Sequence, residues 1–521
     1  MAYTGTAKSL YDSLEGKRHQ YLERARACSR LTLPYVMPDA GFGPSSALET
    51  PFQGVGARGS NNLASKLLLA LLPPNSPFFR LNIDTYGLLN EGVPEELISE
   101  IEGTLQQVEE SVMDEISREM YRTAIHAALK HLVITGNALL YLPDDGGVRV
   151  FHLDRFVVER DAMGHFTYIA TKETLSFATL DESMKEALYT TGHGENDEIH
   201  LYTAVCREGD EVHIFQDING ALVPGSDGTY PLEKNPYIPL RFSRIDGESY
   251  GRGYVEEYLG DLQSLESLTR AIVEGSAASA KVLFLVNPNG TTRGRTLAES
   301  PNGAIVQGNA QDVSVLQVQK QADLRVAQET VAAIKDRLGA AFLLTSGVVR
   351  NAERVTAEEI RMLSQELESA LGGLYSLLST EMQLPVVKRL MDVMNKQKKL
   401  PKLPKDVVNP VIITGVEALG RGNDLQKLDL FLAGAAQVVG PEAVAQYVNV
   451  GEYFKRRAAS LGIKTNGLVK TSEEMQAASQ QQQQAALLEK AAPQGVKALS
   501  DQMAIAQQQQ PQPGEEEQPQ Q

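Results

Sequence analysis

Residues 254–281 read YVEEYLGDLQSLESLTRAIVEGSAASAK, and this stretch carries the clearest structural pattern in the chain. Its apolar side chains recur at spacings of three or four residues, which places them on one face of an α-helix. At 1.5 Å per residue such a helix would be roughly 42 Å long. The residues of this face are Val255, Leu259, Leu262, Leu265, Thr269 and Ile272.

A second stretch with the same pattern lies at residues 322–344, ADLRVAQETVAAIKDRLGAAFLL. Between the two stretches, β-type runs at residues 283–286 and 313–318 surround turns rich in Gly, Asn and Pro,. The sequence therefore predicts two long helices that bracket a small α/β insert. The apolar face of the second helix comprises Leu324, Ala327, Val331, Ile334, Leu338 and Ala341,.

The segment after the second helix is a short loop, residues 346–355, that contains Arg350 and Arg354. It is followed by TAEE at residues 356–359, where Thr at the N-cap and Glu three residues later form a capping box,. The helix that begins there is predicted to run toward Lys399. A short loop between two apolar-striped helices can project its arginines into a central passage. Two exposed loop arginines without such a role fit the sequence equally well.

The N-terminal half predicts a mixed α/β body. Helical patterns cover residues 8–30 and 61–72, and a glycine-rich turn at residues 54–59 precedes the second of them,. Two more helices are expected between residues 94 and 136. From residue 138 to residue 245, short β-type runs alternate with glycine turns, which is typical of a meandering antiparallel sheet,.

The C-terminal part is predicted to be helical and then disordered. Helices are expected at residues 425–439 and 441–461, before a Gln-rich tail of low complexity,. Taken with the two long helices, these patterns predict an α+β fold that is predominantly helical.

Composition limits the class of protein. At 521 residues the chain is too long for one hydrophobic core, and its formal charge of −17 argues against a broad basic face for nucleic acid,. The longest apolar run, residues 67–72, is far shorter than the ~20 residues of a membrane span,. No secretory signal is apparent at the N-terminus, so we expect a cytoplasmic chain. Cys28 and Cys206 are expected to be buried, reduced thiols,.

One motif favours an enzyme. The sequence Gly247-Glu248-Ser249-Tyr250-Gly251 fits G-x-S-x-G, the nucleophile turn of serine hydrolases,. In that fold the catalytic histidine follows the serine, whereas all eight histidines here, from His19 to His213, precede Ser249,. A serine hydrolase therefore remains only an alternative hypothesis.

Other motifs for catalysis or cofactors are weak. Residues 54–59 fit G-x-G-x-x-G but follow a loop instead of a strand, and no P-loop motif is present,. His126 and His131 are five residues apart and so lie on different faces of a helix, which disfavours a metal site,. The basic run of Lys396, Lys398, Lys399, Lys402 and Lys405 is interpreted as a solvated surface. We predict no catalytic, cofactor-binding or metal-binding residue.

Four longer stretches carry a family resemblance: GARGSNNLASKLLLALL (residues 56–72), GSDGTYP (225–231), DGESYGRGYVEEYLGDL (246–262) and ERVTAEEIR (353–361). Together they resemble the portal proteins, or head-to-tail connectors, of short-tailed double-stranded DNA phages. The resemblance covers nearly the whole chain except the Gln-rich tail. The order of body, long helix, insert, long helix, loop and helix also resembles the portal fold.

The resemblance implies a ring of twelve subunits at the portal vertex of the virion, assembled in the host cytoplasm. Double-stranded DNA would pass through the ring without sequence preference during packaging and ejection. The implied partners are the terminase large subunit, capsid and scaffolding proteins, the tail adaptor and internal core proteins, with no membrane and no cofactor. A helical tail adaptor without a DNA passage remains a further alternative.

The resemblance also implies a division of the chain. The parts are a wing body (residues 1–253), stem helix 1 (254–281), clip (282–321), stem helix 2 (322–346), tunnel loop (347–355), a long helix returning to the wing (356–409), a helical crown (410–475) and the Gln-rich tail (476–521).

In this division Arg350 and Arg354 would face DNA. Further candidates for contacts of the stem or clip with DNA or the motor are Lys335, Arg337, Arg293 and Arg295. Twelve copies at −17 each carry −204 formal charges, so the passage would mostly repel a polyanion and permit sliding,.

Overall fold

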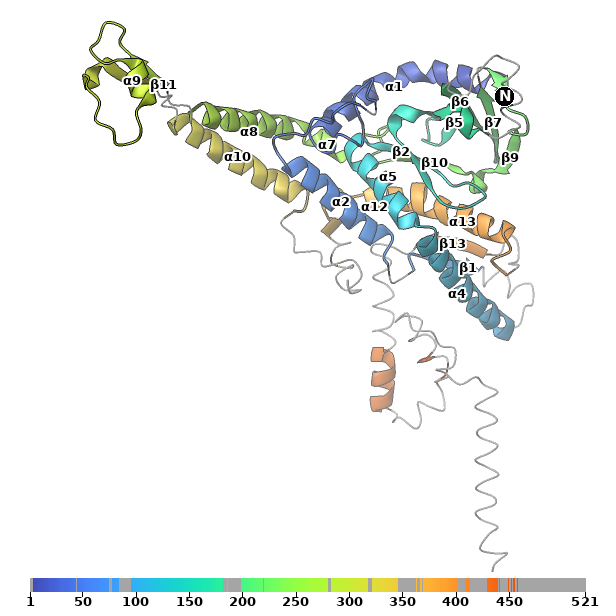
Figure 1. Cartoon of the computed structure of the whole chain (residues 1–521). Coiled ribbons are helices and arrows are strands. Elements are labelled where there is room, and N and C mark those ends of the chain that lie inside the picture. Colours follow the sequence, from blue (N-terminus) through green and yellow to red (C-terminus); the bar gives the residue numbers. More distant parts are fainter. Residues whose placement is uncertain are drawn as a thin grey trace, which may run out of the picture. The chain divides into compact units, whose positions relative to one another are not determined.

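The computed structural model of the chain is shown in Figure 1. By its contacts the chain divides into two compact units, residues 1–418 and 419–521. The residues that the structure describes are 3–43, 45–74, 77–83, 95–180, 185, 198–218, 220–279, 283–316, 321–344, 362, 366–367, 369–401, 408–412, 429–438, 440, 448, 451, 453–454 and 457.

The larger sheet of the first unit is an antiparallel meander, as the sequence predicts. Its strands follow the order β4-β5-β6-β7-β8, and β9 also pairs with β7. Helix α1 (Ala7–Arg30) lies across this sheet and buries Leu10, Tyr11 and Leu14 in one cluster with Val157 (Figure 1). The strands are β4 (Phe156–Arg160), β5 (Phe166–Ser176), β6 (Glu198–Glu208), β7 (Glu211–Ile218), β8 (Ala221–Leu222) and β9 (Gly228–Pro231).

A second core surrounds helix α5 (Tyr121–Thr135), which packs against α1, α2 (Val55–Leu71) and α4 (Glu95–Arg118). Gly136 ends α5 in the left-handed conformation, with φ of 80°, and confirms the predicted C-cap glycine,. The chain then enters β2 (Asn137–Tyr141), the central strand of a three-stranded sheet. Its neighbours are β10 (Tyr237–Arg241) and β3 (Arg149–Phe151).

The glycine-rich stretch at residues 54–59 belongs to the start of α2, so the predicted turn is wrong. Gln53 Oε1 accepts a hydrogen bond from the N–H of Gly56 at 2.9 Å and thereby caps the helix. The glycines serve close packing: a Cβ on Gly56 would lie 2.3 Å from the carbonyl oxygen of Leu31, and one on Gly59 would lie 2.6 Å from the ring of Phe342. A loop that could cradle a dinucleotide phosphate is absent from this stretch.

Helices α8 (Leu259–Ser279) and α10 (Gln321–Ala341) lie side by side (Figure 1), which confirms the two predicted long helices. The predicted single helix at residues 254–281 is wrong in one respect, because it breaks at Tyr258 between the short α7 (Tyr254–Glu257) and α8. The rings of Tyr254 and Tyr258 both pack on Phe342, with centroids 5.7 and 5.8 Å from it, and this packing favours the break.

The insert between the two helices is a small α/β module, as predicted. Strand β11 (Leu283–Val286) pairs antiparallel with β12 (Val313–Leu316), and the short helix α9 (Gly294–Glu299) lies between them in the sequence. One carboxylate oxygen of Asp312 accepts hydrogen bonds from the N–H groups of Thr291 at 2.8 Å and Thr292 at 3.1 Å, so this side chain fixes the turn after β11.

The long helix predicted for residues 356–409 is interrupted. Gly372 adopts the left-handed conformation with φ of 56°, and α12 (Leu374–Leu378) follows, then a π-helix, η6 (Ser379–Gln383), and α13 (Leu384–Lys396). The predicted capping box at residues 356–359 lies outside the described residues.

The predicted boundary after residue 409 is also wrong. Strand β13 (Val408–Ile412) pairs antiparallel with β1 (Phe79–Ile83), which joins it to the first unit. That unit continues to Ala418. Strand pairing across more than 300 residues of sequence cannot be inferred from local patterns.

In the second unit, residues 429–438 form a helix, within the stretch predicted at 425–439. The Gln-rich tail at residues 476–521 lies outside the described residues. Among the described helices, none is long and apolar enough to cross a membrane.

Both cysteines, Cys28 and Cys206, are buried free thiols, as predicted. Burial raises the pKa of each thiol to about 12,.

Candidate functional site

The candidate basic residues of the stem and insert have different surroundings. Arg337 on α10 donates to both carboxylate oxygens of Asp261 on α8, at 2.6 and 2.7 Å, so its charge ties the two helices together. This hydrogen bonding raises the pKa of Arg337. Lys335, two residues earlier on the same helix, is exposed and forms no ion pair within the described part of the chain.

In the insert, Arg295 pairs with Glu299 at 2.9 Å on the exposed face of α9, and Arg293 immediately precedes that helix. Arg350 and Arg354, the two candidates of the predicted tunnel loop, lie outside the described residues. Lys335 and Arg337 both lie on α10, but two residues apart they point to different sides of the helix, whereas Arg293 and Arg295 lie in the insert at α9,.

Helix α10 ends earlier than predicted, at Ala341 instead of residue 346. Leu343 adopts φ of 54°, which is unusual for a residue with a branched side chain, and the N–H of Leu344 bonds back to the carbonyl of Gly339 at 2.8 Å,. Tyr254 donates its hydroxyl to the carbonyl of Ala341 at 2.9 Å. These contacts fix the point at which the chain leaves the helix.

Two side chains of α2 complete this helix end. Asn62 donates its amide to the carbonyl oxygens of Phe342 and Leu343, both at 3.1 Å. Lys66, only 2% exposed, donates its ammonium to the carbonyl of Leu343 at 3.1 Å and to a carboxylate oxygen of Glu366 at 3.3 Å. Sequence reasoning missed Lys66, although a lysine within the apolar run LASKLLLALL is a signal that could have singled it out.

Ser249 does not have the surroundings of a hydrolytic nucleophile. Its hydroxyl oxygen accepts the backbone N–H of Arg160 at 3.2 Å, and its carbonyl accepts the Arg160 side chain at 3.1 Å. The neighbouring Tyr250 is buried and accepts the N–H of Val158 at 3.1 Å. The G-x-S-x-G segment lies between β10 and α7 in the sequence and hydrogen-bonds both to Asn137 of β2 and to β4. No histidine contacts Ser249 among the described hydrogen bonds.

The histidines of α5 face different partners, as their spacing predicts. His126 Nε2 lies 3.2 Å from the hydroxyl of Ser65, whereas the ring of His131 stacks on His152 with centroids 6.3 Å apart. The Nδ1 atoms of His131 and His152 are buried without a hydrogen-bond partner in the described structure. Desolvation, with a smaller repulsion from His152, lowers the pKa of His131 to about 3,.

This buried pair predicts sensitivity to mild acid. The unfolded chain binds a proton at His131 below pH ~6.5, whereas the folded chain does not until the pH approaches the lowered value, so stability is lost as the pH falls,. From pH 7 to pH 5, His131 alone should reduce the free energy of unfolding by about 2 kcal/mol. Urea unfolding followed by circular dichroism should show that this part of the loss is absent in His131→Phe. An unchanged pH dependence in that variant would contradict the assignment.

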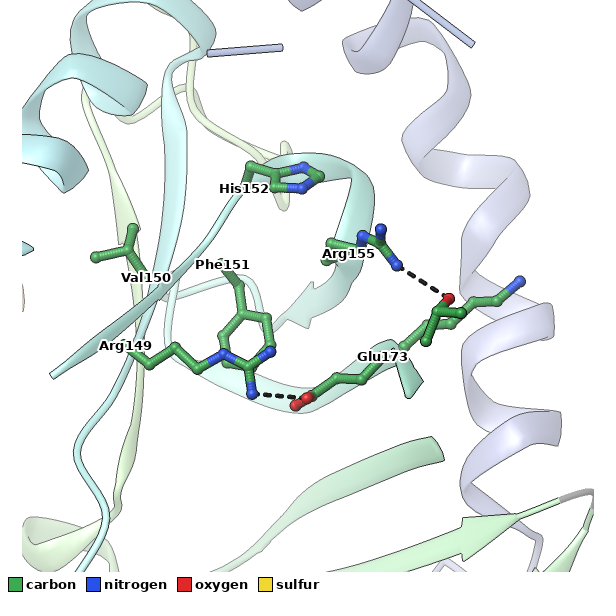
Figure 2. A pocket seen from close by; sticks show the side chains of 8 residues that line it. Arg149, Val150, Phe151, His152, Arg155 and Glu173 are labelled. Carbon is green, nitrogen blue, oxygen red and sulfur yellow. Dashed lines mark hydrogen bonds and ion pairs between the residues drawn. The ribbon is translucent and has the colours of Figure 1, made fainter. Parts of the chain in front are cut away.

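A hollow of about 250 Å³ lies beside the three-stranded sheet (Figure 2). Its cationic side chains are already engaged: Arg149 pairs with Glu173 at 2.6 Å, and Arg155 donates to the hydroxyl of Thr174 at 3.2 Å. Lys172 lies over the ring of Tyr202 at 5.9 Å. A carboxylate and a hydroxyl of β5 already bind the two arginines of this hollow. These contacts hold two segments of the chain together, and they leave neither arginine available as a catalytic group.

Two buried arginines, which sequence reasoning also missed, bind distant parts of the body together. Arg241 at the end of β10 donates to both carboxylate oxygens of Glu381 in the π-helix, at 2.6 to 3.3 Å. Arg389 on α13 donates to the carbonyl of Leu142 at 3.0 Å and to Asp144 at 2.9 Å. Each is 2% exposed or less. They link β10 to the π-helix and α13 to the loop after β2, within the body from which α8 and α10 extend (Figure 1).

No group of three or more His, Cys, Asp or Glu side chains that could hold a metal ion occurs in the described part of the chain. The features that distinguish this molecule are therefore the paired helices, the capped end of α10 and the surface charge. Helices α7 and α8 contribute five acidic side chains and a single basic one, Arg270.

Comparisons with known proteins agree on one group. The sequence matches the family described as bacteriophage head to tail connecting protein over residues 4–469. It is 42% identical over 479 residues to the portal protein of Escherichia phage T7, covering 90% of this chain and 89% of that protein. The portal protein of Enterobacteria phage T3 is 42% identical over 499 residues, covering 94% and 92%. That of Enterobacteria phage SP6 is 31% identical over 479 residues, covering 90% of each chain.

Proposed function

Because this chain belongs to the bacteriophage head-to-tail connecting proteins and is a portal protein, we propose that twelve copies close into a ring through which double-stranded DNA moves. DNA would enter the capsid through this ring during packaging and leave through it at infection. The proposed site is the portal vertex of the virion, reached after assembly in the host cytoplasm. The serine-hydrolase interpretation of Ser249 is not supported, and the family membership and the contacts of Ser249 both argue against it.

The α8–α10 pair is the observation that carries the ring proposal. Near the body its seam is buried, with Leu262, Leu265 and Leu338 fully covered. Farther along, Val273 on α8 is 48% exposed and Val326 on α10 is 63% exposed. Large apolar side chains on the outside of a long helix pair are suited to contact with neighbouring copies. A closed ring requires one face of each copy to contact a different face of the next copy. The two long helices, which lie side by side, provide two such faces.

Charge supports passage of DNA without tight binding. The formal charge of −17 per copy repels a polyanion, which favours sliding over retention,. Arg350 and Arg354 in the proposed tunnel loop, with Lys335 as a further candidate, would supply the local contacts to phosphate. Such contacts are independent of sequence and exchange easily.

The insert is proposed as the clip, which meets the terminase large subunit during packaging and the tail adaptor afterwards. Its small sheet exposes Phe284 by 61% and Leu285 by 52%. Because adjacent residues of a strand point to opposite faces, both faces of this sheet carry an exposed apolar side chain. Capsid, scaffolding and internal core proteins are the further proposed partners, and no cofactor is needed because an ATPase would supply the force.

Electron microscopy of the purified chain tests the proposal. We expect annular particles with a central hole, with the number of copies per ring counted from class averages and particle mass. A helical tail adaptor without a passage would give rods or filled particles. A chain that remains a single subunit at every concentration tested would refute the ring.

A further inference from the structure

Helices α8 and α10 each have a far face, the side turned away from the seam between them, and the two far faces carry charges in a matching order. The far face of α8 presents Arg270 and Glu274, and that of α10 presents Arg325 and Glu329. Each of the four lies two residues from an apolar residue of the seam pattern, which places it about 160–200° around the helix from that residue,. All four are exposed in a single copy.

The two helices run antiparallel, and their register follows from contacts across the seam. A Cβ on Gly275 would lie 3.5 Å from the side chain of Leu324, and Arg337 binds Asp261 at 2.6 Å farther along. The two contacts agree, because residue 261 lies fourteen positions before residue 275 and residue 337 lies thirteen positions after residue 324. Positions at equal distances from the first contact therefore lie at the same height along the pair.

Opposite charges on the two far faces lie at the same heights. Glu274 precedes residue 275 by one position, and Arg325 follows residue 324 by one. Arg270 precedes residue 275 by five positions, and Glu329 follows residue 324 by five. A far face of α8 set against a far face of α10 at the same height thus brings together two pairs of opposite charges.

Within one copy these charges are only weakly matched. Arg325 and Glu329 form an i,i+4 pair of 3.3 Å whose side chains are 81% and 69% exposed, and such a pair contributes little to the stability of the fold,. Arg270 lies 3.5 Å from Glu266, which also accepts two backbone N–H groups at 3.1 Å. Glu274 forms no ion pair within the described part of the chain. Pairing with a second copy would match these charges more fully.

Small side chains allow the two far faces to approach closely. Ser267 and Ala332 are both eight positions from the contact of residues 275 and 324, and Ala333 lies beside Ala332. All three are exposed. Helices with small side chains at their contact can pack with their axes about 8 Å apart, near the lower limit for packed helices.

We propose that in the ring the far face of α8 in each copy packs against the far face of α10 in the next copy. Glu274 then pairs with Arg325 of the neighbouring copy, and Arg270 pairs with Glu329 of the neighbouring copy. Rotation about the ring axis does not change height, so helices that run along this axis meet in the register that they have within one copy. The contact joins two different faces, as a closed ring requires. This inference rests on the proposed function.

Exchange of the two charges on α10, Arg325→Glu with Glu329→Arg, tests the pairing. It keeps the net charge and the i,i+4 pair within the helix, but it sets like charges against both Arg270 and Glu274 of the next copy. We expect the protein concentration at which half of the chains are in rings to rise about tenfold, as measured by analytical ultracentrifugation. Adding Arg270→Glu with Glu274→Arg should restore most of the assembly.

The control is the same exchange in the insert, Arg295→Glu with Glu299→Arg. This i,i+4 pair of 2.9 Å is also exposed, at 89% and 65%, and it lies outside the proposed contact. The control should form rings at the original concentration, and circular dichroism checks the helix content of each variant. Unchanged assembly of the α10 exchange would overturn the inference, and so would an equal loss of assembly in the control.

Disulfide cross-linking tests the register independently of charge. Gln263 on α8 and Asp336 on α10 are both twelve positions from the contact of residues 275 and 324, and both are exposed. Chains with Gln263→Cys are mixed with chains that carry Asp336→Cys before assembly, and the rings are then oxidised. We expect disulfide-linked dimers in the mixture and none with either variant alone, because only the facing positions come within reach of a disulfide.

The natural thiols, Cys28 and Cys206, are buried and should give little background. The control uses Gln328→Cys in place of Asp336→Cys, about 12 Å away along α10, and should give few dimers. If rings form but Gln263→Cys and Asp336→Cys do not link, the proposed contact is wrong while the ring stands. If the original chain forms no rings, the ring proposal itself fails, and this inference fails with it.

Discussion

Replacement of Arg241 with methionine should lower the free energy of unfolding by about 3–5 kcal/mol, because it leaves a carboxylate without its partner inside the body. Arg241 is 2% exposed and donates to Glu381 at 2.6 Å and to the carbonyl of Gly164 at 3.1 Å. Glu381 has 19% of its side chain exposed and would keep a charge in a poorly hydrated place. Urea unfolding of the full chain at neutral pH, followed by circular dichroism, measures the loss.

The double variant Arg241→Met with Glu381→Met provides the control for this prediction. Removing both charges avoids the unpaired carboxylate, so the double variant should recover most of the lost stability. A parallel substitution of an exposed pair, Arg325→Met with Glu329→Met, should change stability by less than ~1 kcal/mol,. An Arg241→Met chain as stable as the original would show that the buried pair contributes little.

The second large effect is expected at the proposed tunnel loop. Charge reversal of both arginines, Arg350→Glu with Arg354→Glu, should leave the ring intact and reduce nuclease-protected DNA per particle by about tenfold, because phosphate contacts become repulsive. Every copy in the ring carries both substitutions, so the repulsion that each copy exerts on the DNA phosphates adds up around the ring. Particle counts by electron microscopy and protected DNA are measured on the same sample.

A charge-matched control excludes a general effect of acidity. Lys172→Glu with Lys398→Glu changes the formal charge by the same amount at a half-exposed and an exposed position of the body. This control should package normally. Equal DNA content in the arginine variant and the control would count against the loop assignment.

The long helices were predictable because their pattern is local. Leu262 and Leu265 on α8, and Leu338 on α10, each belong to an apolar pattern with three- or four-residue spacing, and each is buried in the seam between the two helices. The left-handed C-cap at Gly136 also follows from a single residue type. Where one residue and its near neighbours determine the structure, the sequence was sufficient.

The errors arose where distant parts of the chain decide the outcome. Gly56 and Gly59 resemble a turn motif, but their conformation follows from contacts with Leu31 and Phe342 that no local pattern reveals. The break at Tyr258 likewise depends on Phe342, and β13 depends on pairing with β1. The family was recognisable from four stretches of sequence, because their combined length is specific even where their structure was misassigned.

The candidate site was predictable only in part. Arg350 and Arg354 were singled out by their place between two patterned helices, whereas the partners of Lys66 and Arg241 lie 300 and 140 residues away in sequence. A buried cation within an apolar run signals that a partner exists but does not identify it. Arg337 was a candidate for DNA contact, and its pairing with Asp261 became visible only when α8 and α10 were placed together.

The two buried thiols have a consequence for the life of the particle after the host cell lyses. Only the thiolate form of cysteine reacts readily with oxidants, and a pKa of about 12 leaves Cys28 and Cys206 almost entirely protonated near neutral pH,. A phage released into an aerated medium therefore carries no reactive sulfur at these positions. Disulfide cross-links between copies are therefore disfavoured at these two positions,.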